Sequence, residues 1–124
     1  MNKRIVLIED NRAVRENTAE ILELSGYEVM QAENGRVGLD LVYAGHVDLV
    51  VCDMMMPEMD GYGVLNLLRK NAPTATIPFI FLTAKAESVD IKKGIEMGAD
   101  DYVVKPFEDI ELLDAVEKQL KKST

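Results

Sequence analysis

Short apolar runs and amphipathic stretches alternate along this chain. The apolar runs occupy residues 5–8, 27–30, 49–52, 79–82 and 102–104, and the run at 27–30 is the weakest. They are rich in Val, Ile and Phe, and runs of this length and composition are typical of strands that are buried on both faces. The pattern therefore predicts five short, buried strands.

Between these runs, apolar positions recur at helical spacing. In the first stretch Val14, Thr18 and Leu22 fall on one face, and Gly26 is a good position for the helix to end. Similar stripes predict four more helices, the last with Ile110 on its apolar face, around residues 39–42, 64–68, 89–97 and 110–120. A strand–helix unit repeated five times favours parallel strands joined by right-handed crossovers. The predicted fold is α/β: a flavodoxin-like three-layer sandwich in which helices cover both faces of a doubly wound parallel sheet.

Size and composition limit the classes of protein to consider. The 124 residues suit one domain, which we place at residues 1–124. No apolar run approaches the ~18 residues that a membrane span needs, and the apolar stretch near Met1 is too short for a signal peptide. The lone Cys52 cannot form an internal disulfide, so we expect a cytoplasmic protein without membrane contact. The net charge of −8 argues against direct nucleic-acid binding by this domain.

Four of the five predicted strands end in chemically active side chains. Glu9 and Asp10 follow the first strand, Asp53 the third, Thr83 the fourth and Lys105 the fifth. In an open parallel sheet the ligand site lies at the carboxyl ends of the strands, near the point where the strand order reverses. We therefore expect three carboxylates, a hydroxyl and an ammonium group to meet at one edge of the sheet.

Three neighbouring carboxylates repel one another strongly in a partly desolvated cleft, so they must take up protons or bind a cation. An all-oxygen ligand set suits Mg²⁺, or Mn²⁺, with water and phosphate oxygens completing the coordination. The acidic loop that begins at Glu9 and Asp10 would repel a bare phosphate, which argues against a nucleotide site without a metal. A nucleophilic oxygen, a metal and donors for the equatorial oxygens are the parts that phosphoryl transfer to a carboxylate requires.

Five segments carry a family resemblance. They are Val-Leu-Ile-Glu-Asp at 6–10, the stretch at 48–61, Ile-Phe-Leu-Thr-Ala at 80–84, Gly-Ala-Asp-Asp-Tyr at 98–102 and Lys-Pro-Phe at 105–107. Together they resemble the receiver domain of two-component response regulators, including the single-domain chemotaxis type, over roughly residues 3–121. The resemblance implies strand order 2-1-3-4-5 and a phosphoryl acceptor rather than an enzyme with a substrate of its own.

The resemblance also implies a role for each strand-end residue. Asp53 would accept the phosphoryl group, and Glu9 and Asp10 would hold Mg²⁺ with Asp53 and the backbone carbonyl of Met55. Thr83 would bond a phosphoryl oxygen, and Lys105 would pair with the phosphoryl charge.

A second set of implications concerns the switch. Tyr102 would turn inward when Thr83 moves toward the phosphoryl group, and Lys105–Pro106 would be a cis peptide. The output surface would be the fourth helix, the fifth strand and the fifth helix, whose mixed charges suit either a phosphorylation-dependent homodimer or a solvated face. The phosphoryl donor would be a sensor histidine kinase or a phosphotransfer protein, and the domain could be the N-terminal part of a longer regulator.

The methionine-rich loop after Asp53 and one lysine bear on the lifetime of the phosphoryl group. We expect the methionines to be packing residues; they are Met54, Met55, Met56 and Met59. In the resembled family, the positions two after the acceptor and two after the threonine tune this lifetime, and here they are Met55 and Lys85. An apolar Met55 cannot position a hydrolytic water through its side chain, so we predict slow self-dephosphorylation.

Three other functions remain to be weighed. A scaffold that is never phosphorylated would not need the intact set of Asp53, Thr83 and Lys105. A flavin-binding electron carrier of the same fold would need a hydroxyl-rich loop after the first strand, where this chain has acids. A hydrolase with an aspartyl nucleophile would want a second Asp at position 55, which is Met.

Overall fold

The computed structural model describes residues 2–84 and 88–122. In this part of the chain the strands are β1 (Arg4–Ile8), β2 (Glu28–Ala32), β3 (Leu49–Asp53), β4 (Phe79–Thr83) and β5 (Asp101–Val104). The helices are α1 (Arg12–Leu24), α2 (Gly35–Tyr43), α3 (Gly61–Lys70), the short 3-10 helix η1 (Ala72–Thr74), α4 (Ser88–Glu96) and α5 (Asp109–Lys122). The predicted alternation of strands and helices is confirmed.

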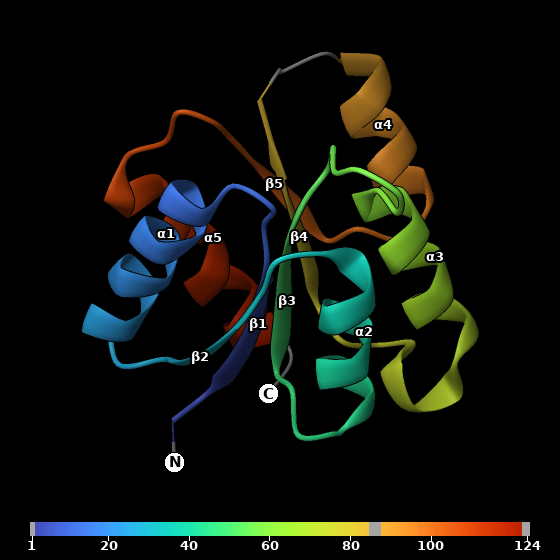
Figure 1. Ribbon diagram of the computed structural model, residues 1–124, viewed down its shortest axis with the longest axis horizontal. Helices are drawn as coiled ribbons and strands as arrows, with labels where there is room; N and C mark the ends of the chain where they lie inside the picture. The colour runs from blue at the N-terminus through green and yellow to red at the C-terminus, as the bar shows by residue number, and fades with distance from the viewer. Residues whose placement is uncertain (1, 85–87, 123–124) are drawn as a thin grey trace.

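The strands form one parallel sheet in the order β2-β1-β3-β4-β5, as predicted. Helices α1 and α5 cover one face of the sheet, and α2, α3 and α4 cover the other (Figure 1). The strand order reverses between β1 and β3, because the chain leaves β1 in one direction and returns to its other side. The loops at the carboxyl ends of β1 and β3 therefore diverge and leave room for a site between them.

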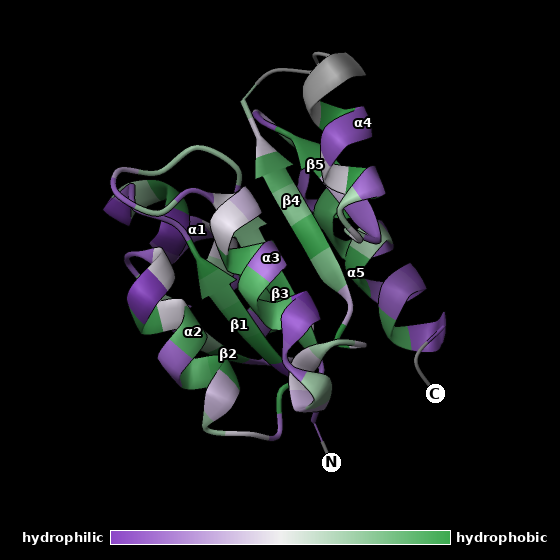
Figure 2. Ribbon diagram, turned by 90° about the vertical axis from the view of Figure 1, so that its right-hand side faces the viewer, coloured by the Kyte–Doolittle hydropathy of each residue, from purple (hydrophilic) through white to green (hydrophobic). Residues whose placement is uncertain are grey.

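Alternation along each central strand divides the core into two layers. In β1, Ile5 and Leu7 pack with α1 and α5, whereas Val6 and Ile8 pack with α2 and α3. All four side chains are fully buried. In Figure 2 the central strands are green, and hydrophilic positions, drawn in purple, lie on the helices that cover the sheet. The buried Cys52 belongs to the second of these layers, as expected for a small apolar residue.

Three helices begin close to the carboxyl edge of the sheet, each with a side-chain cap. Asn11 accepts a hydrogen bond from the Val14 amide, at 3.0 Å, at the start of α1. Asn34 caps α2 in the same way, and Asp60 caps α3 by accepting from the Gly63 amide at 2.9 Å. Such caps satisfy amides that have no partner inside the helix, so they fix where each helix starts.

Two predictions about buried side chains are wrong. Ile110 is 62% exposed, because the buried stripe of α5 follows Leu112, Val116 and Leu120. Ile110 precedes that stripe by two residues, which places it about 200° around the helix. Met55 is 71% exposed, although Met54 and Met56 are buried as expected.

None of the helices among residues 2–84 and 88–122 has the length and apolar character needed to cross a bilayer.

Candidate functional site

The predicted site residues lie at the carboxyl edge of the sheet. Glu9 directly follows β1, Asp53 and Thr83 are the last residues of β3 and β4, and Lys105 directly follows β5. The strand register aligns these ends, since Asp53 pairs with Leu82 and Thr83 with Val104. The sheet therefore carries residues that are far apart in sequence to one edge, as the strand order predicts.

Three carboxylates cluster at this edge. Oxygens of Glu9, Asp10 and Asp53 all lie within 4.8 Å of one another. Glu9 is fully buried and Asp53 is 6% exposed, whereas Asp10 is open to solvent. This is the predicted acidic group, and its burial makes the mutual repulsion of the carboxylates strong.

Lys105 reaches into the cluster from the strand that lies farthest from Glu9 among the four contributing strands. Its Nζ lies 2.7 Å from Glu9 Oε1 and 3.3 Å from Asp53 Oδ1. The Lys105–Pro106 peptide is cis, as the sequence resemblance implies. The ammonium group thus bridges the two buried carboxylates, and no other cation makes an ion pair with either of them among the described residues.

The protonation of the cluster follows from burial and from these contacts. Burial, together with the hydrogen bond that protonated Asp53 donates to Glu9 and repulsion from the Glu9 charge, raises the pKa of Asp53 to about 7. Burial acts on Glu9 in the same direction, but the hydrogen bonds from Lys105 and Asp53 outweigh it and lower the pKa of Glu9. Burial opposes the charge of Lys105 as well, and its acidic partners still raise the pKa of its ammonium group. One ammonium group is therefore too little positive charge for the cluster, and Asp53 is the carboxyl that takes up a proton.

A divalent cation fits this donor set. The clustered donors are all carboxylate oxygens, the kind of ligand that Mg²⁺ and Mn²⁺ prefer. The raised pKa of Asp53 indicates that the cluster lacks a compensating charge. Met55 follows Asp53 by two residues in the adjoining loop, so its carbonyl belongs to the same segment.

Thr83 and Tyr102 lie on the two adjacent strands β4 and β5. Thr83 is 4% exposed and stands one residue beyond Leu82, the partner of Asp53 in the sheet. Tyr102 pairs with Phe81 and is 38% exposed. The structure therefore brings Thr83 next to the acidic cluster and places Tyr102 nearer the surface, on the output side predicted from the sequence.

The loop between β3 and α3 closes tightly over the end of β3. The Gly61 amide donates to the Met54 carbonyl at 2.9 Å. A Cβ at Gly61 would lie 2.5 Å from the backbone oxygen of Asp53 and 2.7 Å from the Phe81 ring, so only glycine fits. Lys85, the second residue in the lifetime prediction, lies outside the described residues.

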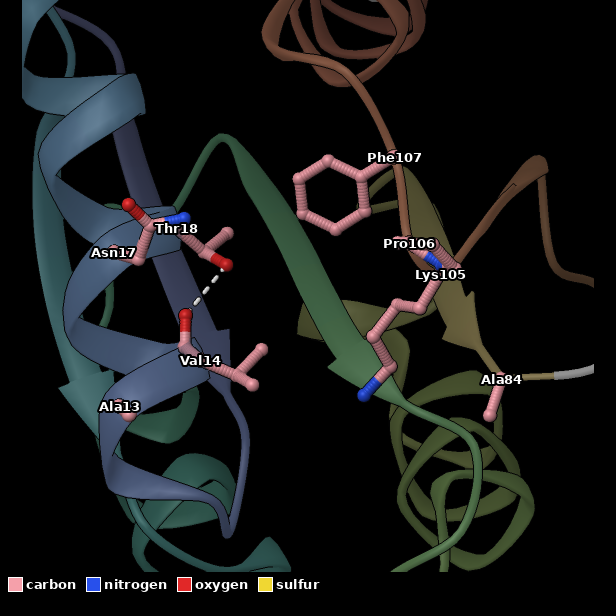
Figure 3. Close-up of a pocket in the computed structure, with 8 residues that line it drawn as sticks. All are labelled: Ala13, Val14, Asn17, Thr18, Ala84, Lys105, Pro106 and Phe107. Atoms are coloured by element: carbon pink, nitrogen blue, oxygen red, sulfur yellow. Dashed lines mark hydrogen bonds between the residues drawn. The ribbon is translucent and has the colours of Figure 1, made fainter.

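A groove beside the cluster was not foreseen from the sequence. It has a volume of about 600 Å³ and lies between α1 and the segment that follows β5. Figure 3 shows Val14 on one side of the groove and Phe107 and Lys105 on the other. Lys105 also belongs to the acidic site through the contacts of its Nζ. The lining is mainly Ala13, Val14, Ala84, Pro106 and Phe107. Ala84, Pro106 and Phe107 lie in segments that carry the family resemblance, but no spacing in the sequence places them opposite α1.

Two further contacts organise the loop between β1 and α1. The Asn11 amide donates to Glu9 Oε2 at 3.3 Å, and Arg15 Nη1 donates to the backbone carbonyl of Glu9 at 2.9 Å. Sequence reasoning missed Arg15, since a basic residue in the second turn of an amphipathic helix is usually a surface residue.

Similar proteins point in the same direction as this geometry. The response regulator MprA of Mycolicibacterium vanbaalenii is 40% identical over 124 residues, covering 100% of this chain and 53% of that protein. The DNA-binding dual master transcriptional regulator RpaA of Synechocystis is 38% identical over 120 residues, which are 97% of this chain and 50% of RpaA. The chain thus spans about half the length of these curated relatives.

Solved structures agree on the fold. The receiver domain of the Francisella response regulator 1452 has a TM-score of 0.92 and 29% identity, with coverage of 99% of this chain and 100% of that one. The model of the response regulator receiver domain family matches residues 5–117, which include every residue of the acidic cluster together with Thr83, Tyr102 and Lys105. The chain therefore belongs to the family of response regulator receiver domains.

Proposed function

We propose that Asp53 is the phosphoryl acceptor of this receiver domain, in a reaction that depends on Mg²⁺ or Mn²⁺. The observation that carries the proposal is the buried carboxylate of Asp53, whose Oδ1 lies 3.3 Å from Lys105 Nζ and within 4.8 Å of oxygens of Glu9 and Asp10. A buried acid with one ammonium partner and two acidic neighbours is an unfavourable arrangement unless a cation and an anion bind there together.

The chemistry assigns a step to each residue. An Asp53 carboxylate oxygen attacks the phosphorus, the O–P bond forms, and the P–N bond to the donor imidazole breaks. Glu9, Asp10, Asp53 and the Met55 carbonyl hold the metal, which when bound neutralises the carboxylates and the phosphoryl oxygens. Lys105 then exchanges its contact with Asp53 for one with a phosphoryl oxygen.

The readout is proposed to pass through Thr83 and Tyr102. Thr83 donates its hydroxyl to a phosphoryl oxygen, and the space it leaves admits the Tyr102 ring. The phosphoryl group thereby shifts the surface formed by α4, β5 and α5 toward one of two packings, because only that packing contacts the phosphoryl group favourably. Tyr102 is 38% exposed, so its ring is not buried before this change.

The proposed donor is a phosphohistidine of a sensor kinase or of a phosphotransfer protein. The groove between α1 and the segment after β5 supports this partner, because Lys105 lines both the groove and the acidic cluster. A partner whose apolar surface fills the groove would therefore hold its imidazole near Asp53. The domain itself would turn over no substrate of its own.

The proposed output is that of a longer regulator. The chain matches half the length of RpaA, which is named as a DNA-binding transcriptional regulator. We therefore propose that residues 1–124 act as the receiver of such a regulator, with DNA contact made by a part outside this domain. A phosphorylation-dependent homodimer through α4, β5 and α5 is the arrangement that would transmit the signal.

Beryllofluoride, which mimics a phosphoryl group on a carboxylate, tests this proposal against the scaffold function. We expect Mg²⁺ and beryllofluoride together to shift NMR signals of Thr83, Tyr102 and the α4, β5 and α5 amides in the wild type. Asp53→Ala should give no such response. A wild type that responds no more than Asp53→Ala would instead support a scaffold that is never phosphorylated.

A further inference from the structure

Arg15 makes a contact that its position does not lead one to expect. The residue lies in the second turn of α1, on a partly buried face, and its Nη1 donates to the carbonyl of Glu9 at 2.9 Å. Side chains of a helix point toward its N-terminus, so Arg15 can reach back over the first turn to the end of β1. Its guanidinium thus bonds to the backbone that connects Glu9 with Asp10.

The contact closes a ring of hydrogen bonds around this loop. Glu9 N donates to the Ala32 carbonyl at 3.0 Å, and Glu9 Oε2 accepts from the Asn11 amide at 3.3 Å. Asn11 caps α1 through Val14, and its carbonyl accepts from the Arg15 amide at 2.9 Å. The Arg15 side chain then returns to the Glu9 carbonyl, so that the end of β1 and the start of α1 are tied together.

Holding one carbonyl fixes the orientation of a whole peptide group. The peptide between Glu9 and Asp10 is planar, so its rotation moves the Glu9 oxygen and the Asp10 nitrogen together. Asp10 is exposed and is the least buried member of the acidic cluster. The hydrogen bond from Arg15 therefore restrains the backbone nitrogen of Asp10, and with it the point from which the Asp10 side chain extends.

We infer that Arg15 is a positioning residue for the divalent-cation site, acting on Glu9 and Asp10 through the peptide that joins them. The inference rests on the proposed cation site but adds a residue to it. Arg15 acts through the backbone and not as a ligand, because a guanidinium cannot coordinate a metal. Groups that orient metal ligands in this way contribute to metal affinity although they do not touch the metal.

A second arginine on the same helix supplies the control. Arg12 is 82% exposed and pairs with Glu16, at 2.9 Å from Nε to Oε1. Removing a positive charge near an acidic site should, by electrostatics alone, tighten the binding of a cation. If Arg15 acted only through its charge, its substitution would tighten the binding of Mg²⁺. If Arg15 acts as a restraint, the same substitution weakens the binding of Mg²⁺.

The test is a titration of Mg²⁺ into the whole chain, followed by the NMR amide shifts of the β1–α1 loop and repeated by calorimetry. Arg15→Met should weaken the affinity for Mg²⁺ by about tenfold, at the lower end of what loss of an orienting contact costs in other metal sites. Arg15→Lys, which can still donate one hydrogen bond to the Glu9 carbonyl, should recover part of that loss. Arg12→Met should leave the affinity unchanged or raise it slightly.

The outcomes separate this inference from the proposed function. If the wild type binds Mg²⁺ and a folded Arg15→Met binds it equally well or more tightly, Arg15 has no positioning role. If the wild type does not bind Mg²⁺ at all, both the proposed cation site and the role of Arg15 are wrong. Should Arg15→Met fail to fold, the comparison passes to Arg15→Lys, which keeps the charge and whose affinity must then fall below that of the wild type.

Discussion

At the scale of single residues, the function depends on the difference between Asp53 and Glu9. Both carboxyls are buried and both contact Lys105, at 3.3 Å and 2.7 Å respectively. The shorter contact keeps Glu9 ionised, and Asp53 is left with a raised pKa. The proposed acceptor is therefore the less well neutralised of the two, and it is the carboxylate that gains most when cationic charge arrives.

The raised pKa of Asp53 predicts how stability depends on pH without metal. As pH rises from 3.8, the ordinary pKa, to about 7, the folded protein keeps a proton that the unfolded chain has lost. Stability that is present at low pH is therefore lost as pH rises through this window, since the folded state binds more protons. Asp53→Asn removes the ionisable group, so it should be more stable than the wild type above pH 7 by about 1–3 kcal/mol.

Urea unfolding of both proteins in EDTA, measured across that pH range, checks the prediction. Lowering of the Glu9 pKa acts in the opposite direction but only at more acidic pH. Saturating Mg²⁺ should flatten the dependence of the unfolding free energy on pH in the wild type and leave that of Asp53→Asn nearly unaffected. Parallel curves for the two proteins in EDTA would contradict the assigned protonation of Asp53.

Met55 predicts the lifetime of the phosphoryl group. Its side chain is 71% exposed beside the acceptor, and a thioether accepts hydrogen bonds only weakly, so it cannot hold an attacking water in line. We expect the phosphorylated wild type to lose its group over minutes or longer, and Met55→Asn, whose amide can orient a water, to lose it severalfold faster. Release of phosphate measured after rapid removal of the donor gives both rates.

Met55→Leu is the matched control, because it keeps an apolar side chain of similar volume. Its rate should equal that of the wild type. A wild-type half-life of seconds in the presence of Mg²⁺, or equal rates for Asn and Leu at position 55, would refute the role assigned to Met55.

At the scale of elements, the turn from β3 into α3 fixes the backbone of Asp53, the proposed acceptor. A Cβ at Gly61 would lie 2.5 Å from the Asp53 carbonyl oxygen and 3.1 Å from Met54 Cα, so backbone atoms would have to move. Gly61→Ala should therefore destabilise the fold by about 1–3 kcal/mol. It should also reduce the rate of phosphorylation, because the displaced backbone is that of Asp53 itself.

Gly63→Ala is a control from the same helix. Its Cβ would approach only the Met59 and Asp60 side chains, with Met59 Cγ nearest at 3.1 Å, and a flexible side chain can yield. Because Ala favours a helix over Gly by about 1 kcal/mol, this variant should be neutral or stabilising. Thermal unfolding and the phosphorylation rate of both variants check this prediction. A greater loss of stability or rate in Gly63→Ala than in Gly61→Ala would contradict it.

The sequence predicts the elements well because hydrophobic period and strand length are local signals. The runs at 5–8, 49–52 and 79–82 all lie in buried strands, and the acids and Lys105 follow the strands as expected. Exposure within an element was harder to predict. The predicted burial of Ile110 and Met55 was wrong. The position of Ile110 around its helix, and the path of the loop that contains Met55, decide whether each side chain faces solvent.

Contacts between a side chain and a distant backbone group could not be predicted at all. The bond from Arg15 to the Glu9 carbonyl and the division of Lys105 between Glu9 and Asp53 depend on distances of a few ångströms. The same holds for Arg69, which donates to the Ile77 and Gly98 carbonyls and so ties α3 to the segments that lead into β4 and β5. No spacing in the sequence encodes such contacts, because they form only once the helices have packed on the sheet.

At the scale of the whole molecule, the strand order gathers the parts of the site. β1 and β3 are neighbours although a strand and two helices lie between them in sequence, and this adjacency brings Glu9 next to Asp53. β4 and β5 extend the same edge, so that Thr83 and Lys105 complete it. The surface of α4, β5 and α5 adjoins the site, because β5 belongs to that surface and is directly followed by Lys105.

The most direct test is to locate the phosphoryl group itself. The protein is incubated with acetyl phosphate with or without Mg²⁺, and its intact mass and the modified peptide are then determined. We predict one added phosphoryl group, formed only with the metal, labile to hydroxylamine as an acyl phosphate is, and mapped to Asp53, with none in Asp53→Asn. Absence of modification in the folded, Mg²⁺-loaded wild type, or equal modification of Asp53→Asn, would contradict the claim that Asp53 is the acceptor.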